Sequence, residues 1–244
     1  MSGGLLCVIP IISTTYADAC VESLARPDSA AGLKPEELLI VDNSREGFCK
    51  ARYGLETYRD PDGFQLGVPR SWNIGARRVL DEGLDYLVIM SSTMMFGPEL
   101  QTTYRRQLES FWGAKVIEAD GHSYHLIAFH NSVLSLVGLW DENLYPGYFE
   151  AEDHAYRMPM VGWEQGWIRI WCNAVSQSVG GHLNLVNCPA DPLIAYMTDK
   201  WGGRKGEERY VMPWGDKPLD YWPEHTIPEL AEKYGLGPRH EGWW

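Results

Sequence analysis

Cysteine is scarce in this sequence, and the few cysteines follow no pattern. Five cysteines are spread over 244 residues, their number is odd, and no two of them form a Cys-x-x-Cys pair. Disulfide-rich secreted domains and zinc-binding domains place their cysteines at characteristic spacings, which are missing here. We therefore expect reduced thiols in a cytoplasmic protein.

Long apolar runs are also missing. The early run from Leu5 to Ile12 is too short to cross a bilayer, contains Pro10 and has no basic stretch before it. Such a run is typical of a strand that is buried on both faces of a parallel sheet. The sequence thus predicts a protein without a membrane span.

Several signatures of well-known active sites are absent. No Gly-x-Gly-x-x-Gly follows the first apolar run, and there is no P-loop, no Gly-x-Ser-x-Gly and no His-Glu-x-x-His. These absences argue against dinucleotide oxidoreductases, P-loop enzymes, serine hydrolases and zinc proteases.

Positive charge is in the minority. The sequence has 21 Lys and Arg against 33 Asp and Glu, a formal net charge of -12. An acidic surface repels phosphate backbones, so nucleic acid is a disfavoured partner unless the positive charges gather locally. The dense basic cluster consists of Lys200, Arg204, Lys205 and Arg209.

Apolar segments with strand and helix character alternate along the chain. Continuous runs at Leu5 to Ile12, Leu38 to Val41 and Tyr86 to Met90 predict buried strands. Helical spacing predicts one helix that Ser71 caps and Gly83 ends, and another that begins at Pro98. We predict an α/β fold with a mixed, mostly parallel sheet flanked by helices. The expected domain covers residues 1–190, and residues 191–244 form a helical and loop extension packed on it.

Polar residues follow the second strand directly, at Asp42-Asn43-Ser44. The carboxyl ends of strands are where open α/β sheets bind ligands. The order of these and later motifs resembles the family 2 glycosyltransferases of bacterial or phage type, which have the GT-A fold. The resemblance runs from about Leu5 to His182 and rests on Val8-Ile9-Pro10, Leu39 to Ser44, Ser71 to Ala76, the strand ending at Met90, Gly138 to Glu142 and Tyr148 to Arg157.

This resemblance implies a donor site for a nucleotide-diphosphate sugar. It casts Pro10, Ile11 and Asp42 as residues that hold the base and ribose, and Asn73 as a residue near the diphosphate. From the residues alone, two alternatives stay open: Asp42 caps a loop in an Asx-turn with Ser44, and Asn73 is an ordinary residue of a first helical turn.

The family's metal-binding Asp-x-Asp is replaced here by Ser91-Ser92-Thr93. Hydroxyls are poor substitutes for carboxylates as ligands of Mg²⁺ or Mn²⁺, so a divalent metal is disfavoured. Lys200 and Arg204 could supply the missing positive charge from a C-terminal loop, and the alternative is a solvated loop. By resemblance, His182 contacts the diphosphate or a metal.

The pair Glu152-Asp153 is where the sequence places the chemistry. Neighbouring residues at a helix start diverge by about 100°, so only one of the two acids can face a site. One acid would face the acceptor and the other would stiffen the loop, and by resemblance Asp153 is the general base. The alternative is that both acids only favour the helix N-terminus through its dipole. The aromatic residues Trp140 and Tyr148 are candidates for stacking on a sugar ring, and the alternative is that they pack in the core.

The predicted function is therefore an inverting transfer of a sugar to an acceptor hydroxyl. The acceptor is a glycan, a small molecule or a protein. Two rivals remain: a GT-A-like binding protein that lost catalysis with its Asp-x-Asp, and a nucleotidyltransferase, which would also need acidic metal ligands.

Overall fold

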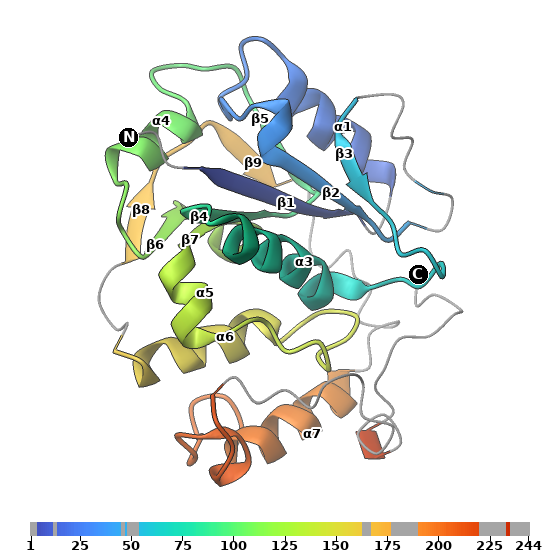
Figure 1. The fold of residues 1–244 in the computed structure, drawn as a ribbon, viewed down its shortest axis with the longest axis vertical. Coiled ribbons are helices and arrows are strands. Elements are labelled where there is room, and N and C mark those ends of the chain that lie inside the picture. Colours follow the sequence, from blue (N-terminus) through green and yellow to red (C-terminus); the bar gives the residue numbers. More distant parts are fainter. Residues whose placement is uncertain are drawn as a thin grey trace.

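The structure, a computed structural model, describes residues 4–11, 14–44, 47, 54–162, 167–176, 190–219, 233 and 234. A seven-stranded sheet has the order β3-β2-β1-β4-β7-β6-β8 (Figure 1). Its strands are β1 (Leu5–Ile11), β2 (Leu38–Asp42), β3 (Glu56–Tyr58), β4 (Tyr86–Met90), β6 (Val116–Ala119), β7 (Leu126–His130) and β8 (Trp167–Ile170). Strand β7 is antiparallel to both neighbours, and the other pairings are parallel.

Helices cover both faces of this sheet. The first face packs on α1 (Thr14–Ala25) and α4 (Tyr104–Ser110). The second packs on α3 (Gly67–Glu82), α5 (Asn131–Val137) and α6 (Glu150–Met160). All seven residues of β1 are buried, as its continuous apolar sequence predicts, because successive side chains enter the two cores in turn.

Close approach of α3 to the sheet depends on Gly75. A β-carbon added at this position would lie 2.9 Å from the β-carbon of Val8 and 3.0 Å from a methyl carbon of Leu87. Neither neighbour can withdraw, since both side chains lie in the core. Gly75 therefore fixes how near the helix lies to β1 and β4.

Two predicted helix starts differ from the structure. Helix α3 begins at Gly67, and Ser71 lies inside it, where its hydroxyl donates to the carbonyl of Gly67 at 2.5 Å. Helix α4 begins at Tyr104 after the cap Thr103, well beyond Pro98. In both cases contacts with distant segments act at the observed start: the amide of Val68 donates to the carbonyl of Pro146, and the amide of Tyr104 donates to the carbonyl of Ala30. The predicted end at Gly83 is confirmed, with φ of 66°.

The C-terminal helix α7 (Ala190–Trp201) lies beyond α6, on the side away from the sheet (Figure 1). The rings of Tyr156 on α6 and Trp201 on α7 are 4.8 Å apart. That residues 191–244 form an extension of one domain stays a prediction. The remaining described elements are the two-stranded sheet of β5 (Met94–Phe96) and β9 (Ala174–Ser176), and the 3-10 turns η1 (Pro35–Glu37), η2 (Ser123–His125) and η3 (Pro213–Gly215). No helix in these described ranges has the length and apolar character that a bilayer crossing requires.

Candidate functional site

The carboxyl edge of the sheet gathers the polar turns that the sequence marks. Strands β1, β2 and β4 are parallel, so their carboxyl ends meet at one edge, and the antiparallel β7 begins there. The turn after β4 touches η2, because the amide of Ser91 donates to the carbonyl of His125 at 2.9 Å. A ligand at this edge would lie beside η2.

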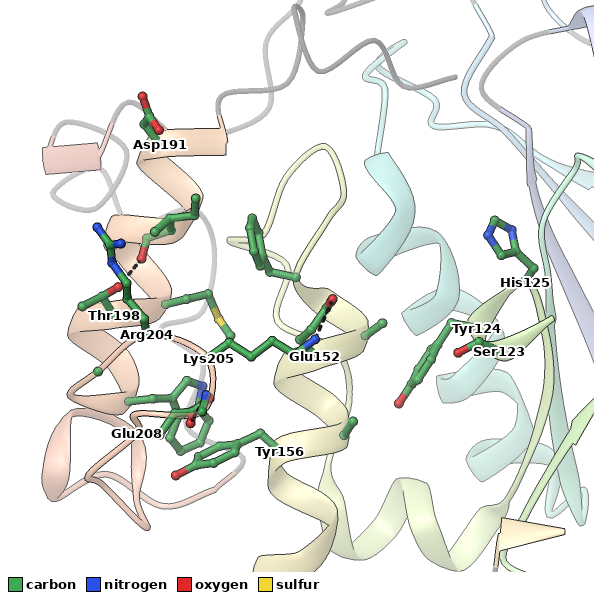
Figure 2. Close-up of a pocket in the computed structure, with 18 of the residues that line it drawn as sticks. Ser123, Tyr124, His125, Glu152, Tyr156, Asp191, Thr198, Arg204, Lys205 and Glu208 are labelled. Carbon is green, nitrogen blue, oxygen red and sulfur yellow. Dashed lines mark hydrogen bonds and ion pairs between the residues drawn. The ribbon is translucent and has the colours of Figure 1, made fainter. Parts of the chain in front are cut away.

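A pocket of about 1140 Å³ opens between η2, α6, α7 and the loop after α7 (Figure 2). Pockets of this order hold small-molecule substrates. Its walls carry the aromatic residues Tyr124, Phe149, Tyr156, Trp167 and Trp201 and the charged residues Glu152, Asp191, Arg204, Lys205 and Glu208. The pocket thus combines ring faces with both signs of charge.

The turn Ser91 to Thr93 presents hydroxyl groups and no carboxylate. The hydroxyls of Ser91 and Thr93 are 2.8 Å apart, and that of Thr93 is 3.2 Å from the hydroxyl of Ser176. Over the described ranges, no three His, Cys, Asp or Glu side chains lie close enough to hold a metal ion. Neutral hydroxyls do not fit Mg²⁺ or Mn²⁺, which prefer carboxylate ligands.

The two neighbouring acids of α6 point in different directions, as helical geometry requires. Glu152 lines the pocket, and its side chain is 38% exposed. Asp153, about 100° further around the helix, has no exposed surface and does not line the pocket. In this structure the pocket is open to Glu152 and not to Asp153, and the role of Asp153 as general base stays a prediction.

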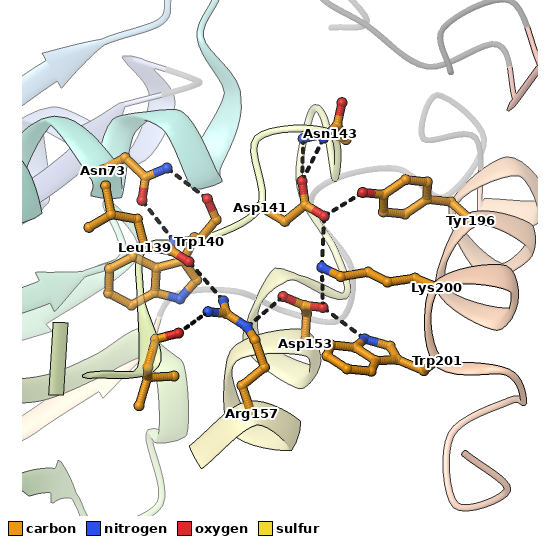
Figure 3. Close-up of polar contacts among 11 residues, drawn as sticks. Asn73, Leu139, Trp140, Asp141, Asn143, Asp153, Arg157, Tyr196, Lys200 and Trp201 are labelled. Atoms are coloured by element: carbon orange, nitrogen blue, oxygen red, sulfur yellow. Dashed lines mark hydrogen bonds and ion pairs between the residues drawn. The ribbon is translucent and has the colours of Figure 1, made fainter. Parts of the chain in front are cut away.

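Asp153 belongs to a buried network of charges that joins α6 to α7 (Figure 3). Its two carboxylate oxygens lie 2.6 Å from Nζ of Lys200 and 3.1 Å from Nε of Arg157. The indole of Trp201 also donates to it, at 2.9 Å. Burial by itself would raise the pKa of Asp153, but Lys200 and Arg157 hold it below its ordinary value.

The sequence predicts that Lys200 supplies positive charge to the site, but in the structure Lys200 does not line the pocket. Its side chain is fully buried, and its ammonium also lies 2.8 Å from Asp141, which accepts from Tyr196 at 2.5 Å. Arg204, on the loop that follows, is exposed and lines the pocket. Only the second of these two predicted phosphate-binding cations is open to a ligand.

Asn73 and Trp140 hold α3 to the loop before α6 instead of lining the pocket. The amide of Asn73 donates to the Trp140 carbonyl at 2.7 Å and accepts from the Trp140 amide at 2.9 Å. The Trp140 ring is fully buried and stacks on His154 at 4.6 Å. Trp140 cannot stack on a sugar in this structure, since its side chain has no exposed surface.

The predicted donor-site residues of the first two strands are buried in the structure. Pro10 is buried in β1, and Ile11 belongs to the core. Asp42 is 4% exposed, and one of its oxygens accepts from the amide of Ser44 at 2.9 Å, which is the Asx-turn alternative. Its other oxygen lies 3.1 Å from Arg59.

Two further predicted residues lie away from the described pocket or outside the described residues. Tyr148 packs against the small core that includes Leu144 and Tyr196 and does not line the pocket. His182 lies outside the described residues.

Sequence reasoning missed Glu150, the first residue of α6. It is 8% exposed, and its Oε2 has no hydrogen-bond partner among the described residues. Tyr148 and Phe149, just before it, are both left-handed, with φ of 76° and 68°. Burial raises the pKa of Glu150 to about 8, and the charges of Glu152 and Asp153 act in the same direction. The only signal for it was a third acid in the motif.

Comparison of the fold with solved structures gives clear matches. Glucosyl-3-phosphoglycerate synthase from Mycobacterium tuberculosis, solved with Mg²⁺ and UDP, has a TM-score of 0.55 at 11% identity and covers 89% of this chain and 91% of its own. The mannosyltransferase PcManGT from Pyrobaculum calidifontis, solved with GDP-Man and Mn²⁺, has a TM-score of 0.53 at 11% identity and covers 80% of this chain. S. aureus TarS has a TM-score of 0.51 at 10% identity and covers 78% of this chain.

These matches confirm the predicted fold class, a GT-A-like α/β fold with a mixed, mostly parallel sheet. This chain spans 63% of the length of the mannosyltransferase and 40% of that of TarS. No protein-family model and no curated protein sequence matches it. At identities of 10 to 12%, the likeness concerns the fold, and function must be argued from the site.

Proposed function

We propose that this protein transfers a glycosyl group from a nucleotide-diphosphate sugar to an acceptor hydroxyl. The observation that carries the proposal is the pocket of Figure 2, which exposes the acid Glu152 on α6. The pocket is also lined by His125, whose carbonyl accepts from the amide of Ser91 in the turn that follows β4. The GT-A-like fold supports the same reaction, since its solved neighbours include structures with GDP-Man or UDP bound.

The general base of the proposed reaction is Glu152. Its carboxylate accepts the proton of the acceptor hydroxyl while the acceptor oxygen forms a bond to the anomeric carbon. The bond from that carbon to the phosphate oxygen breaks, and the nucleoside diphosphate leaves with the electron pair. A single in-line displacement inverts the anomeric configuration. A base in this role typically contributes about 10²- to 10⁴-fold to the rate.

The leaving diphosphate needs positive charge or hydrogen-bond donors. In this proposal the hydroxyls of Ser91, Ser92 and Thr93, in the turn bonded to the pocket residue His125, donate to the diphosphate. The guanidinium of Arg204, which lines the pocket, supplies positive charge. The donor set at the turn does not fit a divalent cation, so no step is assigned to one. We expect donor binding to persist in EDTA.

Asp153 takes a positioning role in this proposal, holding α6 against α7. For Asp153 to act as the base, the ammonium of Lys200 would have to move away from it. The buried carboxylates of Asp153 and Asp141 would then lose the positive charge that they share. Substitutions can distinguish Glu152 from Asp153 as the base. Under the proposal Glu152→Gln abolishes transfer in a folded protein, whereas Asp153→Asn acts first on stability.

The testing experiment is a transfer and hydrolysis assay with UDP- and GDP-sugars, each with Mn²⁺ and with EDTA. We expect turnover of one donor in EDTA, loss of at least about a hundredfold in Glu152→Gln, and an inverted product by NMR. A retained configuration, or full activity in Glu152→Gln, would contradict the mechanism.

A second candidate is a binding protein that holds a nucleotide sugar without turning it over. The burial of Asp153 and the lack of carboxylates at Ser91 to Thr93 favour it. Saturable nucleotide binding with no turnover of any donor would select this candidate.

A further inference from the structure

An ion pair crosses the pocket between its two walls. Nζ of Lys205, on the loop after α7, lies 3.4 Å from Oε1 of Glu152 on α6, and both side chains line the pocket (Figure 2). The Lys205 side chain is 77% exposed, and that of Glu152 is 38% exposed. The pair thus joins two elements that are 53 positions apart in sequence across a space large enough for a substrate.

The two lysines near α6 differ in how easily they can change partner. Lys200 is buried, and its ammonium contacts two carboxylates at 2.6 and 2.8 Å. An ion pair between exposed side chains such as Lys205 and Glu152 contributes little and is screened by salt. Lys205 can therefore leave Glu152 at small cost, whereas Lys200 is held in place.

A diphosphate offers Lys205 a stronger partner than one carboxylate. It carries at least two negative charges and several acceptor oxygens, and charge-assisted bonds to phosphate are among the stronger hydrogen bonds in proteins. The turn at Ser91 to Thr93, which is bonded to the pocket residue His125, carries only neutral hydroxyls. A nucleoside diphosphate in this pocket would thus compete directly with Glu152 for the ammonium.

We propose that Lys205 is an exchangeable counterion that couples nucleotide binding to release of the base. Without nucleotide, Lys205 neutralises Glu152. When a nucleoside diphosphate binds, the ammonium moves to the phosphate oxygens, and the Glu152 carboxylate is free to accept the acceptor's proton. This inference rests on the proposed function, and it implies that the donor binds before the acceptor reacts.

The test measures the affinities of UDP and GDP in EDTA by calorimetry, for the wild type and for Lys205→Ala, Glu152→Gln and the double variant. For whichever of the two nucleotides the wild type binds, Lys205→Ala should lower the affinity by about tenfold. Lys205→Arg should restore most of that affinity. Glu152→Gln should tighten binding, because Lys205 no longer has to leave a carboxylate. The gain should largely vanish in the double variant, which makes the two effects non-additive.

Lys217→Ala is the matched control, because Lys217 lies on the same C-terminal segment, is exposed and does not line the pocket. It should bind nucleotide as the wild type does. The inference would be overturned if Lys205→Ala bound nucleotide as tightly as the wild type does. It would also be overturned if Glu152→Gln raised the nucleotide affinity equally with and without Lys205. Neither result would contradict glycosyl transfer. If wild type binds neither nucleotide and turns over no donor, the proposed function fails with it.

Discussion

The ammonium of Lys200 lies 2.6 Å from a carboxylate oxygen of Asp153, in a place where neither side chain has any exposed surface. Asp141 and Arg157 belong to the same network, so among the described residues two negative charges lie beside two positive ones. Each charge removed alone leaves a buried charge without compensation. The joint between α6 and α7 is consequently a set of charges that act as a unit.

Replacement of Lys200 by methionine should destabilise the protein strongly. Methionine has nearly the same length, so the main change is one uncompensated negative charge among Asp141, Asp153 and Arg157. We expect a loss of about 3 to 5 kcal/mol in the free energy of unfolding, measured by urea denaturation. Lys217→Met, at an exposed ion pair, should change it by less than about 0.5 kcal/mol. Adding Asp141→Asn to Lys200→Met should recover part of the loss, because it restores charge balance.

Acid should weaken the same joint. The pKa of Asp153 is lower in the folded protein than its ordinary value of about 3.9, so the unfolded chain binds the proton more readily. The stability that Asp153 contributes is present above that ordinary value and is lost as the pH falls through the lower folded pKa. Unfolding in urea at pH 7, 5, 4 and 3 should show a fall below pH 4 that persists in 0.5 M salt. Asp81→Asn, at an exposed site on α3, should leave this fall unchanged; a flat profile from pH 5 to pH 3 would contradict the argument.

Much of the fold was predictable because its signals are local. Strand β4 has the predicted bounds, Tyr86 to Met90, since five consecutive apolar residues between polar neighbours suit a strand covered on both faces. Gly83 ends α3 because only a left-handed residue closes the helix there cheaply. In contrast, the predicted start of α4 was wrong, because Pro98 and Leu100 suit a helix but the chain is held elsewhere by the cap at Thr103.

The site was less predictable because it depends on contacts between distant segments. Which acid of Glu152-Asp153 faces the pocket is fixed by the phase of α6 and by α7, whose Lys200 lies 47 positions beyond Asp153. Trp140 is an aromatic residue near the site in sequence, but nothing local shows that Phe129 and His154 cover its ring. Lys205 stood in a basic cluster with no sign that it reaches α6.

Replacement of Asn73 by alanine should lower stability without a direct effect on nucleotide binding. The substitution removes two hydrogen bonds to the Trp140 backbone and one to Glu142 at 2.9 Å. It leaves the buried amide and carbonyl of Trp140 without these partners. We expect a loss of about 2 to 4 kcal/mol in unfolding free energy. Arg77→Ala removes an exposed bond to the same Glu142 and should cost far less. A nucleotide affinity weakened tenfold in a folded Asn73→Ala would instead support its predicted donor role.

Trp167 should contribute to acceptor binding, in place of the buried Trp140. It lines the pocket and is 38% exposed, so a ring face is open to a sugar. Trp167→Ala should raise the KM for a glycan acceptor roughly two- to tenfold, since a ring contact is worth about 0.5 to 1.5 kcal/mol. Trp171 is 52% exposed on the same segment but lies off the pocket, so Trp171→Ala is the control. Equal effects of both substitutions would argue against a specific platform.

Glu150 should make the protein less stable in alkaline solution. Its pKa is raised to about 8 by burial, so the folded protein holds the proton more tightly than the unfolded chain. The stability linked to this proton is fully present below the ordinary pKa of a glutamate and is lost as the pH rises through about 8. Glu150→Gln keeps the shape and removes the titration, so its Tm should fall less than that of the wild type between pH 5.5 and pH 9. Glu109→Gln, at an exposed site on α4, should behave as the wild type does. Equal falls in Glu150→Gln and wild type would show that Glu150 is not the group that binds this proton.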